Sequence, residues 1–216
     1  GHINWSRRFD HMQQHTGQHI LSQAFIQIAQ AETVGFHLSE NSLTIDLHQA
    51  NLTPSQVEES EFLANQIIWQ NRPIHIRFVT QAEAQKLALR KLPPVKQGKL
   101  RLIEIDKFDL TACGGTHVKQ TGEVGQIKIV KLERQNNQLR VEFCCGQRAL
   151  RDYRLKNSVV NQLAADLTTS IPEIVTSVTR TKEENKALRR TMKTQQEQLL
   201  YIEETKLLKN GKMVGE

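Results

Sequence analysis

Apolar residues recur at helical spacing near the start of the chain. Between residues 10 and 30 the side chains that share one helical face are Ile20, Leu21, Ala24, Phe25 and Ile28. Asp10 precedes this run and is predicted to cap the helix. A second helix is predicted from Pro54 to about Trp69, because Thr53 opens a capping box and proline suits the first helical position. The capping-box pattern recurs at Thr80 and Glu83.

Short β-branched and apolar runs separate these helices. The predicted strands cover residues 32–38, 42–48, 72–79, 100–105, 126–133 and 139–145. Turn residues "SEN" and "RQNNQ" join the first two and the last two as hairpins, and "KLPPVKQGK" is a predicted loop. The strand at 100–105 leads into "DKFDLTACGGTHV", in which "CGGTH" is predicted to form a tight, glycine-assisted loop. We therefore expect an α+β fold in which a mainly antiparallel sheet packs with helices.

Strand signals stop at about Gly146. A helix is predicted over residues 148–167, and after Pro172 a long polar helix follows. Its apolar residues approximate a heptad pattern at two sets of positions: Ile171, Val178, Asn185, Met192 and Leu199, and Ile174, Thr181, Leu188, Gln195 and Ile202. We expect a long C-terminal helical extension that pairs with a partner helix over part of its length; a tail helix without a partner is the alternative.

The pattern divides the chain into two predicted parts, residues 1–150 and residues 151–216. The chain starts with "GHINW" instead of Met and stops straight after a helical pattern, so we expect a fragment of a longer protein. The second part would then be a helical stalk or coiled-coil segment that leads to a missing C-terminal domain.

Composition and charge indicate which binding partner and which cellular compartment to expect. The net charge of +6 favours a polyanionic partner such as RNA, but aromatic residues make up only 5% and do not alternate with basic ones. A base-stacking platform is therefore not indicated, and any RNA contact should be mainly to phosphates. The sequence has no apolar run near 18 residues and no apolar signal peptide at its start, which favours the cytoplasm.

An odd number of cysteines, 3, indicates reduced thiols or a metal ligand, and Cys144 and Cys145 are expected to be structural thiols.

Three histidines in "HMQQHTGQH" lie four residues apart on the first helix. Histidines at positions i and i+4 can bind one metal ion, whereas His11 and His19 lie about 12 Å apart along a helix, too far to share one. The pair is therefore His11 with His15 or His15 with His19. Cys113 and His117 of "CGGTH" would complete a ligand set of the kind that Zn²⁺ prefers.

The motifs "HTGQH" and "CGGTHV", with "TGEVGQIKI", resemble the editing domain shared by alanyl-tRNA synthetase and the freestanding alanyl-tRNA editing proteins. The likeness covers residues 5–155 and is greatest to the freestanding bacterial proteins. It implies zinc bound by His15, His19, Cys113 and His117, with His11 outside the motif. It also implies hydrolysis of the ester that joins a wrong amino acid, chiefly serine with glycine as a second candidate, to the tRNA for alanine.

The resemblance leaves the chemistry open at two points. Four protein ligands usually mark a structural zinc site, whereas hydrolytic zinc keeps one position open. "HTGQH" also lacks the Glu that supplies a zinc protease with its base, so we assign no general base. To select serine over alanine the site needs a polar partner for the hydroxyl, and Thr33 is the nearest candidate, with a buried strand threonine as the alternative.

Two basic clusters are candidate contacts for tRNA phosphates. The residues singled out are Arg90, Lys91, Arg148, Arg151 and Arg154, with Lys96, Lys99, Arg101 and Lys156 beside them. A solvated surface is the alternative for both clusters. The rival functions are an editing-domain fragment of an alanyl-tRNA synthetase and a non-catalytic RNA-binding module with structural zinc. A second copy of the chain, bound through the C-terminal helix, is a further candidate partner.

Overall fold

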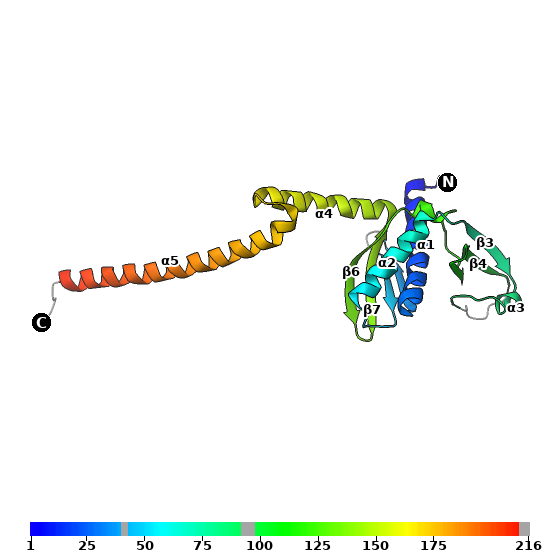
Figure 1. Cartoon of the computed structure of the whole chain (residues 1–216), viewed down its shortest axis with the longest axis horizontal. Helices are drawn as coiled ribbons and strands as arrows, with labels where there is room; N and C mark the ends of the chain where they lie inside the picture. Colours follow the sequence, from blue (N-terminus) through cyan, green and yellow to red (C-terminus); the bar gives the residue numbers. More distant parts are fainter. Residues whose placement is uncertain (40–42, 92–97, 212–216) are drawn as a thin grey trace. The chain divides into compact units, whose positions relative to one another are not determined.

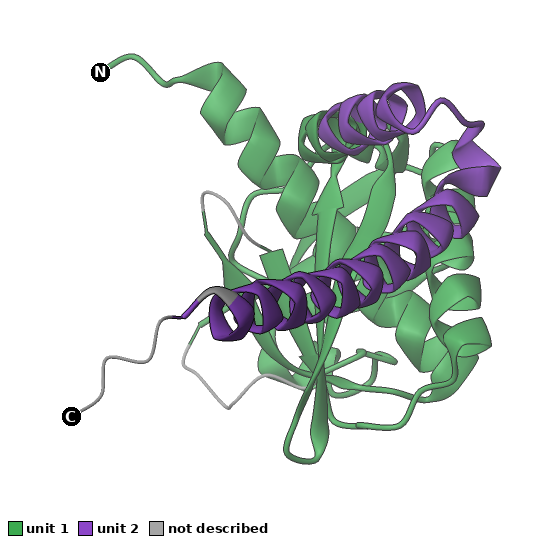
Figure 2. Cartoon of the chain, turned by 90° about the vertical axis from the view of Figure 1, so that its left-hand side faces the viewer, with its two compact units in different colours: residues 1–153 green, residues 154–216 purple. Residues whose placement is uncertain are grey.

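The structure of the chain is a computed structural model that describes residues 1–39, 43–91 and 98–211. It divides into two compact units, residues 1–153 and residues 154–216 (Figure 2). The predicted turn at residues 39–41 and the predicted loop at 91–99 fall largely outside the described residues, as does Lys96.

Two long helices form the framework of the first unit (Figure 1). Helix α1 covers Trp5–Ala29, and the Asn4 side chain caps it by accepting from the Arg7 N–H. The prediction that Asp10 is the cap is therefore wrong: the helix starts earlier, and the Asp10 carboxylate instead binds the Arg148 guanidinium at 2.7 Å. Helix α2 covers Pro54–Trp69, and its capping box confirms the prediction at Thr53.

The strands form two antiparallel sheets. One has the order β1-β2-β7-β6 and the other the order β3-β4-β5, which confirms an α+β fold. The strand bounds are Thr33–Leu38 (β1), Leu43–Leu47 (β2), Ile74–Val79 (β3), Leu100–Ile105 (β4), Asp109–Ala112 (β5), Ile127–Gln135 (β6) and Gln138–Cys145 (β7). Strand β5 was not predicted, because four residues are too few to show an alternating pattern. The short helix α3 (Gln81–Ala84), with its predicted capping box, lies between β3 and β4, and η1 (Thr121–Val124) lies between β5 and β6.

Helix α1 packs against α2 and the larger sheet to form the core. Phe25 and Ile20 from α1 and Phe143 from β7 are fully buried there. Buried amides fix the position of the strands: the Gln14 side chain both donates to and accepts from the backbone of Cys145, at 3.1 and 2.9 Å. These bonds satisfy the last residue of β7 and hold it against the middle of α1.

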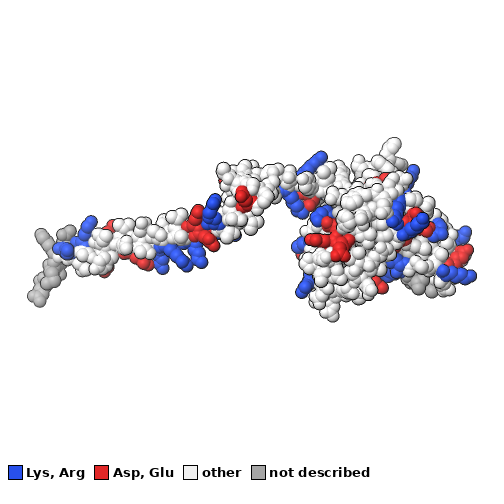
Figure 3. Space-filling model, viewed as in Figure 1, with Lys and Arg blue, Asp and Glu red and all other residues white. Residues whose placement is uncertain are grey.

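The second unit is helical. Helix α4 covers Gly146–Asp166 and begins within the first unit; η2 covers Ile171–Glu173 and α5 covers Ile174–Asn210. Basic and acidic side chains are interspersed along α5 (Figure 3). Its predicted pairing with a partner helix stays a prediction. Within residues 1–39, 43–91 and 98–211, no helix has both the length and the apolar character needed to cross a membrane.

Candidate metal centre

The helical half of the site consists of two histidines one turn apart on α1. The ring centroids of His15 and His19 are 5.1 Å apart. Gly17 lies between them, on a part of the helix that packs closely against β7: a Cβ at this position would lie 2.3 Å from Cys145 Sγ. The glycine of "HTGQH" is therefore explained by packing, because it lets the helix approach the sheet.

The other half is the loop that follows β5. Arg101 of β4 holds this loop, since its Nη1 donates to the carbonyl oxygens of Cys113 at 2.7 Å and Gly115 at 2.8 Å. Gly115 lies directly under the His15 ring, where a Cβ would come within 2.0 Å of Cε1. Only glycine fits there without displacing the ring. The motifs "HTGQH", which contains His15, and "CGGTH", which contains Gly115, therefore depend on each other sterically.

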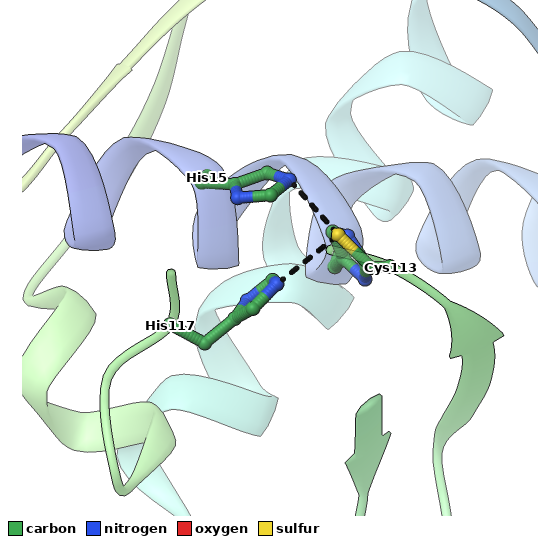
Figure 4. A group of neighbouring side chains, drawn as sticks. His15, Cys113 and His117 are labelled. Atoms are coloured by element: carbon green, nitrogen blue, oxygen red, sulfur yellow. Dashed lines mark hydrogen bonds between the residues drawn. The ribbon is translucent and has the colours of Figure 1, made fainter. Parts of the chain in front are cut away.

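These halves bring four side chains together: His15, His19, Cys113 and His117 each offer one ligand atom, and all four atoms lie within 4.8 Å of one another. Figure 4 shows Cys113 Sγ between two of the imidazoles, 3.5 Å from His15 Nε2 and 3.5 Å from His117 Nε2. Tetrahedral zinc with ordinary Zn–S and Zn–N bonds separates sulfur from nitrogen by about 3.6 Å. The donor types and their spacing therefore fit Zn²⁺.

The electrostatics at Cys113 and His117 favour the protonation states that metals require. Burial raises the pKa of Cys113, but hydrogen bonds from His117, His15 and His19 outweigh it and lower that pKa to about 3. Burial lowers the pKa of His117 to about 4. At neutral pH the site therefore presents a thiolate and a neutral imidazole, the forms that coordinate a metal ion.

A buried carboxylate lies behind one of the histidines. Asp109 Oδ2 is 3.4 Å from His19 Nδ1, and the same carboxylate accepts from Arg90 Nε at 2.8 Å. Burial lowers the pKa of His19, but the Asp109 carboxylate and the Cys113 thiol raise it to a net value above normal. A carboxylate beside Nδ1 favours the tautomer that leaves Nε2 free to bind a metal.

The other buried histidine has a hydroxyl partner. His117 Nδ1 lies 3.2 Å from Thr16 Oγ1, which also accepts from the Val118 N–H at 3.2 Å. Thr16 is fully buried, one residue after His15 on α1. The helix that offers two ligands therefore also orients a third, from the loop.

A small cavity opens beside the cluster. Its volume is about 210 Å³, and His19 is the cluster member among its lining residues, which also include Thr33, Arg90, Lys91 and Thr111. Thr33 Oγ1 donates to the Ser22 hydroxyl at 2.8 Å, and Ser22 also accepts from Gln18 Nε2 at 2.9 Å. The predicted serine-selecting threonine thus lies in a hydroxyl-rich wall close to the candidate metal ligands.

The chain is similar in sequence to several known proteins. Residues 100–142 match the family model "Threonyl and Alanyl tRNA synthetase second additional domain". Over 87% of its length the chain is 32% identical to alanyl-tRNA editing protein Aarsd1-B from Xenopus laevis, and over 70% it is 36% identical to AlaX-L from Pyrococcus horikoshii. Over its whole length it is 30% identical to alanine–tRNA ligase from Pyrococcus furiosus. The chain contains an editing domain of the alanyl-tRNA synthetase family. It spans 46%, 40% and 25% of these relatives.

The basic residues predicted to contact tRNA differ in their surroundings. Arg90 is bound to buried Asp109 and Arg148 to half-buried Asp10, so their charges are already matched by carboxylates. Lys91, Arg151 and Arg154 are exposed.

The structure also shows the surroundings of four further residues that the sequence analysis singled out. His11 is half-buried and outside the four-residue cluster. Cys144 and Cys145 also lie outside the cluster, and neither forms a disulfide. Arg101, predicted as a member of a basic cluster, holds the Cys113 loop.

The side chains that surround the ligands carried little sequence signal. Asp109 and Thr16 are common residue types, and their roles depend on partners that lie 90 and 101 residues away. The only local indication for Thr16 is its position inside "HTGQH". For Asp109 the alternation of buried and half-buried residues along β5 places it on the same face as Thr111.

Proposed function

We propose that the editing domain hydrolyses the ester between a wrong amino acid and the tRNA for alanine, acting in trans with zinc bound to His15, His19, Cys113 and His117. Serine is the preferred amino acid to be removed, and glycine is the second candidate. The observation that carries the proposal is the zinc-like donor set beside a small hydroxyl-lined cavity. The names of the relatives, alanyl-tRNA editing proteins, support the same reaction.

Bound zinc would polarise the ester carbonyl, orient the amino group of the substrate or lower the pKa of a water molecule. The protein contributes the orientation of the imidazoles, because Asp109 and Thr16 lie beside the nitrogens of His19 and His117 that face away from the cluster. No Asp or Glu lines the described part of the cavity, so we assign no general base.

Selectivity for serine would come from the wall formed by Thr33, Ser22 and Gln18. Thr33 Oγ1 donates its proton to the Ser22 oxygen, so the Thr33 oxygen can accept from a substrate hydroxyl at the cavity surface. Alanine has no hydroxyl to make this bond. A site that hydrogen-bonds a hydroxyl rejects the analogue that lacks it.

Phosphates of the tRNA would be contacted mainly by cations that are exposed. Lys91 lines the cavity, and Arg151 and Arg154 lie on the surface of α4. Arg90 and Arg148 can still add positive potential, but their guanidinium groups are held by Asp109 and Asp10. We therefore expect substitution of Lys91 or Arg151 to reduce the slope of log K for tRNA binding against log salt concentration. Each substitution should lower the slope by the amount that corresponds to about one phosphate contact.

The second candidate is the same domain acting within a synthetase. It is favoured by the alignment to the alanine–tRNA ligase of P. furiosus, which covers the whole chain and so includes α4 and α5. Aminoacylation-domain sequence upstream in the gene would favour this reading over action in trans. A non-catalytic RNA-binding module with structural zinc is the third reading, and it predicts bound zinc without ester hydrolysis.

The test compares the zinc-loaded chain with two cysteine variants on tRNA for alanine charged with serine, glycine or alanine. We expect release of serine by the wild type, little release of alanine, and a loss of more than about 100-fold in Cys113→Ala, together with its zinc. Cys144→Ala is the matched control, because Cys144 lies outside the cluster, and it should keep both activity and zinc. Zinc-loaded wild type that releases no serine would contradict the proposed function.

A further inference from the structure

Two large apolar side chains are exposed on strand β3. Ile76 is 52% exposed and Phe78 63% exposed. Strand β3 is the edge of the three-stranded sheet and is paired on one side with β4. An exposed aromatic residue on an edge strand is a liability for aggregation unless it serves a ligand or partner.

The register of the sheet connects Phe78 to the candidate metal centre. Phe78 lies opposite Arg101 on β4, and the Cys113 N–H donates to the Arg101 carbonyl at 3.0 Å, which continues the β4–β5 ladder. Residues directly opposite each other in antiparallel strands place their side chains on the same face. Phe78, Arg101 and Cys113 therefore form one row across one face of the sheet, about 10 Å from end to end at two strand spacings.

The middle member of this row carries a charge without a counter-ion. The Arg101 guanidinium donates to two carbonyl oxygens, and no carboxylate pairs with it in the part of the chain that the structure describes. Carbonyl oxygens orient a guanidinium but do not neutralise it. An exposed ring, a cation and a metal-binding thiol thus follow one another across three strands.

We propose that Phe78 and Arg101 form a nucleotide platform for the unpaired 3′ end of the tRNA. A base stacks on the Phe78 ring, and a phosphate of the same end meets Arg101, while the ester enters the site at Cys113. The low aromatic content of the sequence did not indicate stacking, but a single exposed ring suffices when it lies in the row that leads to the site. This assignment rests on the proposed function and names where its substrate is held.

The test measures stacking separately from hydrolysis. The tRNA carries 2-aminopurine as its terminal base, and stacking on an aromatic ring quenches the fluorescence of this base. Serine is attached through a non-hydrolysable amide linkage, so the signal is measured without turnover. Wild type, Phe78→Ala, Phe78→Trp and Phe62→Ala are compared. Phe62 is the matched control, because it is a phenylalanine of similar exposure, 56%, on α2. Zinc content and circular dichroism verify that each variant is folded.

We expect quenching by wild type, Phe78→Trp and Phe62→Ala, and its loss in Phe78→Ala. With the hydrolysable seryl-tRNA, kcat/KM should fall about tenfold in Phe78→Ala alone, the size expected for one lost stack. Equal quenching and equal kcat/KM in Phe78→Ala and wild type would overturn the platform while leaving the proposed function intact. Quenching that depends on Phe78 without serine release by wild type would support the platform and contradict the proposed function. Binding of the tRNA by all variants without quenching would assign the exposed ring to another partner, such as a protein.

Discussion

Helices α1 and α5 are both long and rich in polar residues, yet they use those residues in opposite ways. Helix α1 has 25 residues, of which 12 are buried, and these include Gln14, Thr16 and His19. Helix α5 has 37 residues, and of those whose side chains are described only Ser177 is buried. In α1 the polar side chains bind the sheet and the Cys113 loop, whereas in α5 they face solvent.

The difference shows where the stability of each helix comes from. Burial of its apolar face stabilises α1. Buried Gln14, Thr16 and His19 depend on partners that are distant in sequence, so substitution of these residues should be costly. The ion pairs at i,i+4 spacing on α5 include Arg180–Glu184 and Lys193–Glu197, both exposed and therefore weak. Single changes on α5 should therefore leave the metal centre unaffected.

Gly115→Ala should have the largest effect, because it places a methyl group within 2.0 Å of the His15 ring and pushes that ring out of the cluster. We expect loss of zinc and a decrease of about 1–3 kcal/mol in the free energy of unfolding. Metal analysis and urea denaturation measure the two effects. The matched control is Gly114→Ala, since a Cβ there meets nothing within 4 Å. Equal zinc content in both variants would show that the contact between Gly115 and the His15 ring does not control metal binding.

Asp109→Asn should weaken zinc binding by about 10- to 100-fold, because the residue that orients His19 loses its charge. Competition with a chromophoric chelator measures the affinity. Asp46→Asn is the control: Asp46 is also a buried aspartate held by an arginine, Arg140, at 2.7 Å, but it lies outside the cluster. Asp46→Asn should leave zinc affinity unchanged. A similar loss in both variants would assign the effect to general destabilisation.

The same Asp46–Arg140 pair predicts a pH dependence of stability. The hydrogen bond from Arg140 holds the pKa of Asp46 below its ordinary value. A carboxyl group with a lowered pKa stabilises the fold above its unfolded-state pKa, and this contribution is lost as the pH falls through the folded-state value. We expect Asp46→Asn to cost about 1 kcal/mol at pH 7 and to converge with wild type in acid. Parallel curves of unfolding free energy from pH 7 to pH 3 would exclude this role.

The sequence predicted what is local and missed what depends on contact. Helix α2 and its capping box follow from four neighbouring residues, and the sheet strands from their alternation. The two motifs that supply the candidate metal ligands were recognisable because each is short and contiguous. Asp109, Thr16 and Arg101 were not, since their partners come from other elements. The start of α1 was misjudged because Asp10 is an acceptable cap residue, whereas the helix begins at Trp5 and the Asn4 side chain caps it.

Substitutions on α5 test whether its exposed apolar residues pair with a second copy of the chain. Met192 and Leu199 share one predicted heptad position and are 63% and 60% exposed. If α5 pairs with a second copy of the chain, Met192→Glu with Leu199→Glu should lower the dimer fraction in sedimentation at micromolar concentration and leave zinc affinity unchanged. Leu207→Glu with Leu208→Glu, equally apolar but outside the heptad positions, is the control. A monomeric wild type would rule out homodimer formation through this helix.

His11→Ala should have the smallest effect, although His11 lies one helical turn before His15 on the same helix. It is half-buried and outside the cluster, whereas His19, one turn after His15, is 4% exposed and approaches Asp109. Spacing along α1 is the same for both histidines, so burial against the Cys113 loop distinguishes a ligand from a neighbour. We expect full zinc content in His11→Ala and loss of zinc in His19→Ala, as measured by metal analysis of both purified variants. Loss in His11→Ala with retention in His19→Ala would reverse the choice of pair and show that α1 presents a different face to the metal.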